Sequence, residues 1–309
     1  MVLFWTILIA VLVVLTLADA YLDRNREPST RLALWRLAGW VGLALAFNAF
    51  VWLGPVYAPE LRQAKALEFL TGYVVEYSLS VDNLFVFVML FAFFKADGKQ
   101  ELKALQWGIY GAMILRLLFI LAGVTLINLF HPVIYLFGAL LLWTAWKMLT
   151  AKETESDPNQ MWLVRMAKTL FPVTDQYHGS RFFIRRDGRR WATPMVLLVV
   201  AVESSDVMFA VDSIPAILSI TTDPFIVFSS NIFAILGLRA LFFLLARMMK
   251  AFRYLKAGVS AILAFVGVKM LLADFVHISV ALSLGVIAVA MAAAVLASVV
   301  HGKKAVEPK

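Results

Sequence analysis

The chain has 309 residues, of which 62% are hydrophobic and only 16% are charged. Soluble domains carry about a quarter of their residues as charges, so this composition excludes a soluble globular protein. The net charge of +8 lies mostly between apolar segments, where membrane topology explains it without a nucleic-acid partner. The absence of cysteine excludes disulfides, thiolate metal sites and thiol redox motifs.

Apolar segments of about 20 residues recur along the chain, each long enough to cross the hydrocarbon core of a bilayer as an α-helix. They predict an all-α polytopic membrane protein with nine transmembrane helices, at residues 2–20, 33–54, 67–94, 104–126, 131–150, 193–218, 224–246, 257–274 and 277–299. The first segment is followed by a small-residue motif that resembles a signal-peptide cleavage site. It lacks a preceding basic region and is longer than usual, so we interpret it as a retained helix.

Basic residues are distributed unequally between the two sides of these segments. Of the 28 lysines and arginines, 22 lie in alternate loops and the C-terminal tail, whereas the opposite side holds only Arg62 and Lys65. Basic loops remain in the cytoplasm. We therefore expect a bacterial inner-membrane protein with its N-terminus outside and its C-terminus in the cytoplasm.

The longest loop, residues 151–192, is expected on the cytoplasmic side. Its segment Met161–Phe171 mixes apolar and basic residues, which is typical of a helix on the bilayer surface. The segment Arg185–Arg190 indicates a basic turn that can contact anionic headgroups. A solvated basic loop explains the same residues equally well.

Polar residues recur at matching positions in segments three to five and six to eight. The matches are Glu76 with Asp206, Asp82 with Asp212, Asn83 with Ser213, Arg116 with Arg239, and Lys147 with Lys269. Three helices per copy give the two copies opposite orientations, as in the inverted repeats of many secondary transporters. The resulting division of a single membrane domain is two peripheral helices (1–66), repeat 1 (67–150), the basic loop (151–192), repeat 2 (193–274) and the last helix with its tail (275–309).

Charged residues within these segments are the strongest functional signal. Each costs about 2.5–3.5 kcal/mol at the bilayer centre, so by default such residues line a wet cavity or pair with one another. The carboxylates are Glu76 and Asp82 in segment three, and Glu203, Asp206 and Asp212 in segment six. We expect Arg116 and Arg239 to gate the site or balance its charge. The alternative is that the carboxylates serve only as structural ion-pair partners of these arginines.

Helix geometry places these carboxylates unevenly. Glu203 and Asp206 are three residues apart and share a face, and Glu203 lies near the expected cytoplasmic entrance. Asp206 and Asp212 are six apart, about 120° around a regular helix. Pro215 removes a backbone donor, and we predict a helix break there that redirects Asp212 towards the site.

The expected ligands are all oxygen atoms. No histidine or cysteine lies near the middle of a segment, whereas Asn83 and Ser213 add neutral oxygens beside the carboxylates. Carboxylate, amide and hydroxyl oxygens suit Mg²⁺, Ca²⁺ or Mn²⁺ rather than zinc or copper. The ligand chemistry does not separate these three ions.

Two longer motifs resemble the paired signatures of the TerC family. They are Glu76-Tyr-Ser-Leu-Ser-Val-Asp82-Asn83 and Glu203-Ser-Ser-Asp206-Val-Met-Phe-Ala-Val-Asp212-Ser213-Ile-Pro215-Ala. Gly72-Tyr73 and the basic loop are most similar to the Alx-like branch. The resemblance implies a metal-ion exporter with manganese as its substrate, and it implies ion-handling roles for Glu76, Asp82, Asn83, Glu203, Asp206, Asp212 and Ser213.

We therefore expect a transporter rather than an enzyme, with no permanently bound cofactor, that exports Mn²⁺ by alternating access, in exchange for protons. Two alternatives stay open. One is a membrane scaffold that recruits partners through the basic loop, and the other is an exporter of a small organic solute. The expected partners are the lipid bilayer, the transported ion (Mn²⁺, with Mg²⁺ or Ca²⁺ as alternatives) and protons.

Overall fold

The computed structural model describes residues 2–22, 30–150, 158–186, 188–248, 255–276 and 278–304. These residues form a helical protein with one small hairpin. The helices are α1 (Val2–Leu22), α2 (Thr30–Leu53), α3 (Pro59–Phe93), α4 (Gly98–Leu129), α5 (Val133–Thr150), α6 (Trp162–Leu170), α7 (Pro194–Leu218), α8 (Pro224–Leu236), α9 (Leu238–Met248), α10 (Leu255–Leu271) and α11 (Val280–Lys304), with a 3₁₀ turn at Pro158–Gln160. Strands β1 (Phe183–Arg186) and β2 (Arg189–Ala192) pair antiparallel.

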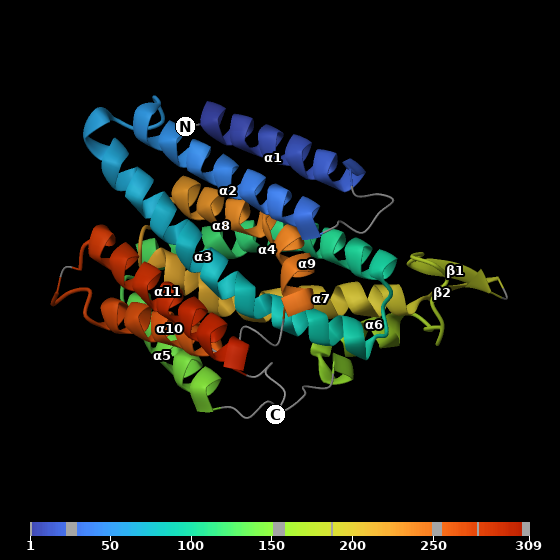
Figure 1. Ribbon diagram of the computed structural model, residues 1–309. Helices are drawn as coiled ribbons and strands as arrows, with labels where there is room; N and C mark the ends of the chain where they lie inside the picture. The colour runs from blue at the N-terminus through green and yellow to red at the C-terminus, as the bar shows by residue number, and fades with distance from the viewer. Residues whose placement is uncertain are drawn as a thin grey trace.

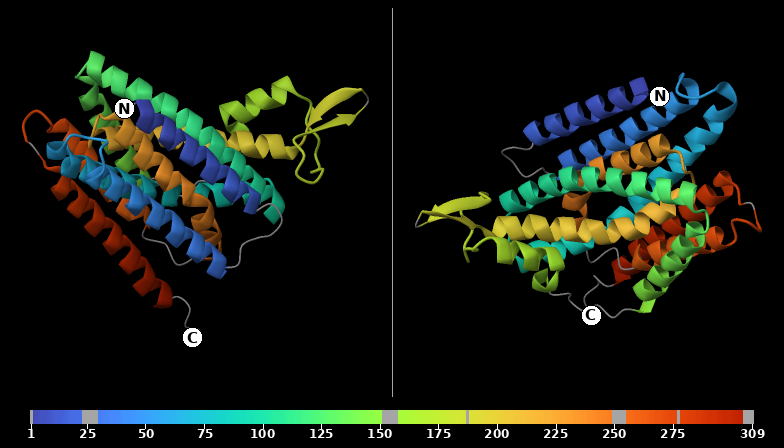
Figure 2. Two further views of the ribbon diagram at one scale, coloured as in Figure 1. Left: turned by 90° about the horizontal axis from the view of Figure 1, so that it is seen from above. Right: turned by 180° about the vertical axis from the view of Figure 1, so that it is seen from behind.

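The long helices lie side by side in one bundle, and the hairpin projects from one end of it (Figure 1). The α8–α9 segment forms the centre, since 94% of its most apolar stretch is buried, against 11% for α2 and 17% for α11. Figure 2 shows α1, α2 and α11 on the outside of the bundle. The chain therefore presents its peripheral helices to lipid and surrounds α8 with protein.

Each apolar segment identified in the sequence coincides with a helix, and segment seven coincides with the α8–α9 pair. Seven of these elements are long and apolar enough to cross a membrane. The apolar part of α1, Val2–Ala18, and helix α10, Leu255–Leu271, are shorter. The polytopic all-α class is confirmed, while the number of nine crossings stays a prediction.

The predicted helix break at Pro215 is wrong. Helix α7 continues through Pro215 to Leu218, and the Ser219 N–H then bonds the Pro215 carbonyl at 3.1 Å. Pro215 lies in the last turn, so the hydrogen bond that it removes costs little continuity. The interruption occurs instead at Gly237, between α8 and α9.

Glycines allow close helix contacts in the bundle. A Cβ at Gly138 of α5 would lie 3.0 Å from the Gly267 carbonyl of α10, and a Cβ at Gly267 would lie 2.9 Å from the Gly138 carbonyl. In a similar way, Gly108 of α4 packs against Val202 of α7. Small residues at helix contacts are the usual route to tight packing in lipid, where no hydrophobic force draws the helices together.

The described residues of the loop 151–192, which are 158–186 and 188–192, are attached to the bundle. Lys103 Nζ donates to the Ser180 carbonyl at 2.6 Å, and the Tyr177 hydroxyl donates to the Phe94 carbonyl at 3.1 Å. Burial, aided by the nearby Asp97 carboxylate, raises the pKa of Tyr177 to about 12. These contacts hold the segment 177–182 against the C-terminal end of α3 and the N-terminal end of α4. They thereby fix the segment that leads into the hairpin.

Candidate functional site

A buried polar cluster lies where α3, α4, α7 and α8 meet. Glu76 and Arg116 are 0% exposed and Asp206 is 6% exposed. The fully described members of this central cluster are Glu76, Arg116, Asp206, Ser213 and Asn231, all of which are buried. Polar residues from four mostly apolar helices thus meet in one buried cluster.

Arg116 joins the two carboxylates of the cluster. Its Nη1 atom donates to Glu76 Oε1, and its Nη2 atom donates to Asp206 Oδ1 at 3.0 Å. The same Nη1 atom lies 3.0 Å from Asn231 Oδ1 and 3.5 Å from Ser213 Oγ. A single guanidinium therefore links helices α3, α7 and α8 from its position on α4.

Neutral groups complete the environment of Glu76. Ser80 Oγ donates to Glu76 Oε1 at 3.3 Å, and Asn231 Nδ2 donates to Glu76 Oε2 at 3.0 Å. Asp206 Oδ2, by contrast, is buried with no hydrogen-bond partner among the described residues. Two carboxylates and one guanidinium leave the central cluster with one formal negative charge, which favours a further cation.

Glu203 lies one turn before Asp206, against α4. A Cβ built on Gly111 would lie 2.0 Å from Glu203 Oε1 and 2.2 Å from Oε2, so the carboxylate rests directly on the glycine. Glu203 Oε2 is buried and has no hydrogen-bond partner among the residues that the structure describes. The expected position of Glu203 beside Asp206 on one face of α7 thus places a third carboxylate beside the central cluster.

We predict that Gly111→Ala displaces the Glu203 carboxylate. The added methyl group overlaps both of its oxygens, and overpacking of this kind costs about 1–3 kcal/mol. Thermal unfolding in detergent measures the loss. Gly42→Ala is the matched control, because a Cβ there has no neighbour within 4 Å. Combining Gly111→Ala with Glu203→Ala should restore most of the stability, and an additive double variant would contradict the contact.

The other predicted carboxylates lie differently. Asp212 Oδ1 accepts a 2.8 Å hydrogen bond from the Thr144 hydroxyl of α5, so Asp212 is directed to the α5 side of α7 and not into the central cluster. Asn83 is buried on α3 but makes no hydrogen bond to the cluster within the described part of the chain. The side chain of Asp82 lies outside the described residues. The expected convergence of Asp206 and Asp212 is therefore not seen, because α7 stays regular between them.

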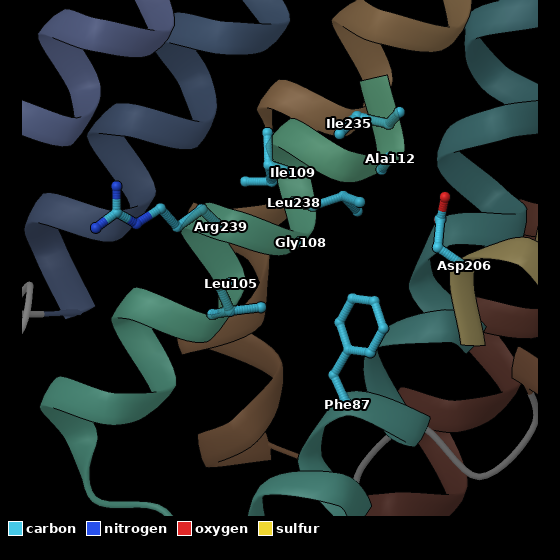
Figure 3. Close-up of a pocket in the computed structure, with 9 residues that line it drawn as sticks. All are labelled: Phe87, Leu105, Gly108, Ile109, Ala112, Asp206, Ile235, Leu238 and Arg239. Carbon is cyan, nitrogen blue, oxygen red and sulfur yellow. The ribbon is translucent and has the colours of Figure 1, made fainter. Parts of the chain in front are cut away.

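Arg239 does not share the carboxylates with Arg116. Both Arg239 and Asp206 line a small cavity of about 20 Å³, with room for about one water molecule. Figure 3 shows them on opposite sides of this cavity, with the guanidinium directed away from the carboxylate. Arg239 is therefore not paired with Asp206 in this conformation, and its expected role in gating or charge balance stays a prediction.

A second polar group, the outer cluster, consists of Tyr57, Lys65, Glu68 and Asp223. The Tyr57 hydroxyl donates to Asp223 Oδ2 at 2.8 Å, and Lys65 Nζ lies 3.4 Å from the same oxygen. Lys65 Nζ also bonds Glu68 at 2.8 Å. Because Asp223 caps the N-terminus of α8, the outer cluster ties the α2–α3 turn to the end of α8.

We predict that Tyr57→Phe loosens this tie. Loss of a hydrogen bond to a charged group that is only part-buried should cost about 1.5 kcal/mol. Burial, with the hydrogen bond to Asp223, raises the pKa of Tyr57 above its usual 10.0. The contribution of the Tyr57–Asp223 hydrogen bond to the free energy of unfolding should therefore be constant below about pH 10 and be lost as the pH rises further. The test measures the free energy of unfolding from pH 6 to 11. It compares the loss caused by Tyr57→Phe in the wild-type protein with the loss caused by the same change in the Asp223→Asn variant, and equal losses would refute the contact.

The site offers oxygen ligands but not a preassembled metal centre. Within the described ranges, no group of three or more His, Cys, Asp or Glu side chains is placed to hold a metal ion. Glu76 and Asp206 supply carboxylates, Asn231 an amide oxygen and Ser213 a hydroxyl. This set suits a hard divalent cation if Arg116 moves aside.

Comparison with known proteins places this cluster in a family. Residues 61–305 match the family described as integral membrane protein TerC family. The chain belongs to the TerC family. The match contains the central cluster and both motifs that resemble the TerC signatures, so the resemblance seen in the sequence is confirmed.

Individual TerC relatives cover most of the chain. Proteins named "Putative membrane-bound redox modulator Alx" from Salmonella typhi and Escherichia coli (strain K12) are each 46% identical, covering 90% of this chain and 88% of their own. The thylakoid membrane protein TERC, chloroplastic, of Arabidopsis thaliana is 41% identical over 90% of this chain and 71% of its own. No solved structure matches this TerC protein.

Sequence reasoning missed Asn231 as a site residue. It lies on α8, 0% exposed, and contacts both Arg116 and Glu76. The available signal was an amide in the middle of the segment Ile226–Leu236, where a polar side chain needs a buried partner. Its partner could not be named without knowing which faces of α3, α4 and α8 meet.

Proposed function

We propose that this protein exports Mn²⁺ from the cytoplasm by alternating access, with the central cluster as its ion site. The observation that carries the proposal is Arg116, fully buried and bound to both Glu76 and Asp206. A buried pair of carboxylates needs a cation. In the ion-free carrier Arg116 is that cation, and a bound dication takes its place.

The displaced guanidinium has a nearby acceptor. Glu203 is one helical turn from Asp206, and its Oε2 atom has no hydrogen-bond partner among described residues. A dication between Glu76 and Asp206 neutralises both, which releases Arg116 to pair with Glu203. Every buried charge would then keep a partner throughout the cycle, as low-dielectric surroundings require.

The helix packing supports the inverted repeat on which alternating access rests. In the repeat, α3 corresponds to α7, α4 to α8 and α5 to α10, and a two-fold axis would exchange each helix with its counterpart. The contact of α4 with α7 then becomes that of α8 with α3, and the contact of α5 with α7 becomes that of α10 with α3. The contacts α3–α7, α4–α8 and α5–α10 map onto themselves. All of these pairs pack in the structure, as a two-fold axis through the central cluster requires.

The conformation matches a carrier that is closed on its outer side. The cavity beside Asp206 is lined by Leu105 and Gly108, which precede Arg116 on α4 and lie towards the α4 N-terminus. The distribution of basic residues between the loops favours the cytoplasmic side for that end. The outer cluster lies on the opposite side. We infer that ions reach Asp206 from the cytoplasm and that the Tyr57–Asp223 contact opens to release them.

Export of a dication requires energy. An inside-negative potential opposes the movement of each positive charge by about 2.3 kcal/mol per 100 mV. We infer exchange with protons, since the carboxylates that release Mn²⁺ can accept protons. We also propose that the protein lies in a bacterial inner membrane with its C-terminus in the cytoplasm, and that it acts as a transporter and not as an enzyme.

The name of the Alx relatives refers to redox modulation. This chain contains no cysteine, so it has no thiol–disulfide couple of its own. We propose that metal transport, and not thiol exchange, is the direct activity of this chain.

Flux into proteoliposomes tests the proposal. A vesicle loaded with a Mn²⁺-sensitive dye should report uptake by the wild-type protein and none by the Glu76→Gln/Asp206→Asn double variant, which keeps the side-chain shapes. Added Mg²⁺ and Ca²⁺ measure selectivity, and added amino acids test the alternative of an organic solute. Undiminished Mn²⁺ flux in the double variant would overturn the site.

A further inference from the structure

A surface on the loop 151–192 remains unexplained by ion transport. The docking surface, as we call it, joins one face of α6 to the hairpin. Its apolar part is exposed and consists of Trp162, Met166, Leu170, Phe171 and Phe183. Its basic part consists of the hairpin arginines Arg185, Arg186, Arg189 and Arg190, all of them exposed.

The apolar part is a continuous stripe. Trp162, Met166 and Leu170 follow each other at intervals of four residues and so lie along one face of α6, at 64%, 46% and 64% exposed. Val164, on another face, is fully buried against the bundle. Phe171 continues the stripe to the hairpin, since its ring lies 5.3 Å from that of Phe183.

The basic part consists of two directly opposed pairs of arginines. Arg185 lies directly opposite Arg190 in the ladder, and Arg186 lies directly opposite Arg189. Like charges at directly opposed positions destabilise a two-stranded ribbon. Successive pairs point to opposite faces, so each face of the hairpin presents two adjacent guanidiniums. Such a pair is suited to a phosphate group, which guanidinium forks bind with two hydrogen bonds.

The place and the chemistry of this surface favour a lipid partner. Figure 1 and Figure 2 show α6 beside the start of α7, with the hairpin at the same end of the bundle. An exposed apolar stripe next to paired arginines matches an interface with acyl chains on one side and phosphates on the other. A soluble polyanion would match the arginines but leave Trp162, Met166 and Leu170 in water.

We propose that the docking surface binds anionic phospholipids of the leaflet next to the bundle end that carries the hairpin. The stripe of α6 inserts at the boundary between headgroups and acyl chains, and the hairpin arginines hold lipid phosphates. This inference is independent of the transported ion, because it uses none of the residues of the central cluster.

The cysteine-free chain makes the test direct. The full-length protein carries one introduced cysteine, Met166→Cys or Leu170→Cys, labelled with an environment-sensitive fluorophore and placed in nanodiscs. In discs with 30% phosphatidylglycerol we expect a blue-shifted emission and quenching by spin-labelled lipid, and in pure phosphatidylcholine discs emission typical of water. Lys168→Cys is the positional control, because residue 168 is exposed and lies at least 120° around α6 from each residue of the stripe; its label should report water in both.

Removing the arginines should reverse the effect. Each basic residue near a bilayer surface is worth about a fivefold change in the ratio of docked to undocked states. The test variant should therefore return the label to water; it changes four arginines to Gln, namely Arg185, Arg186, Arg189 and Arg190. The control variant removes equal charge elsewhere and should leave the label in lipid; it changes four lysines to Gln, namely Lys99, Lys303, Lys304 and Lys309. A label that stays in water in anionic discs overturns the proposal. So does a label that responds only to added polyuridylate, which would assign the surface to nucleic acid.

Discussion

Arg116→Gln is expected to destabilise the protein by about 3–5 kcal/mol, the usual cost of leaving buried charges without their partner. Arg116 is the one residue that contacts both Glu76 and Asp206 in the described structure. Its removal leaves two buried carboxylates with only neutral donors. Thermal unfolding in detergent measures this loss. Arg116→Lys, which keeps the charge but not the two-pronged geometry, should lose less.

A triple variant separates the charge from the shape. Adding Glu76→Gln and Asp206→Asn to Arg116→Gln removes all three charges and keeps similar volumes, so most of the lost stability should return. If the triple variant is as unstable as Arg116→Gln alone, charge imbalance is not the cause and Arg116 acts mainly by packing.

The same variant reports on the transport cycle. If Mn²⁺ takes the place of Arg116, removing that competing cation should strengthen binding. The midpoint of unfolding of Arg116→Gln should then rise more steeply with added Mn²⁺ than that of the wild-type protein, because a ligand present at about 100 times its Kd adds about 2.7 kcal/mol. Equal Mn²⁺ responses would show that Arg116 and the ion do not compete.

The helices of this fold could be predicted from the sequence because membrane helices follow from hydrophobicity and length alone. The central cluster could be predicted in part for the same reason: Glu76, Arg116 and Asp206 are charges in apolar segments and need partners in the membrane. Their pairing could not be derived, since it depends on how each helix is rotated about its axis, and apolar segments of this kind carry little periodicity.

The wrong prediction at Pro215 and the unexpected side-chain directions depend on local helix geometry. Pro215 was expected to break α7, but a proline in the last turn removes a single hydrogen bond near a helix end, and the helix continues. The interruption at Gly237 has no proline to mark it. Because α7 stays regular, Asp212 is directed to Thr144 of α5, and the guanidinium of Arg239 is directed away from Asp206.

This difference between Arg116 and Arg239 fits the proposed cycle. A carrier built from two inverted repeats is open to both sides, or to neither, when its halves adopt the same conformation. Alternating access requires the halves to differ at any moment. With Arg116 in the central cluster and Arg239 directed away, the halves differ at their most charged matching positions.

Asp206→Asn and Glu76→Gln are each expected to weaken Mn²⁺ binding by about 100-fold or more, and Asp212→Asn by about tenfold or less. Changing a group that merely supports a metal ligand costs about 10–100-fold in affinity, so a direct carboxylate ligand should reach at least the upper end. Asp212 bonds Thr144 on α5 instead, and its Asn replacement can still accept that hydrogen bond. Titration of each purified variant with Mn²⁺, followed by calorimetry, gives the three affinities.

The contrast between Asp206 and Asp212 decides whether α7 must change shape during transport. The two residues are six apart, about 120° around a regular helix, and α7 is regular through both. If the ion site uses the helix as it stands, Asp212→Asn should resemble Thr144→Val and not Asp206→Asn. A loss in Asp212→Asn as large as that in Asp206→Asn would mean that α7 unwinds to bring both carboxylates onto the ion. The regular helix, with Pro215 only in its last turn, predicts the smaller loss.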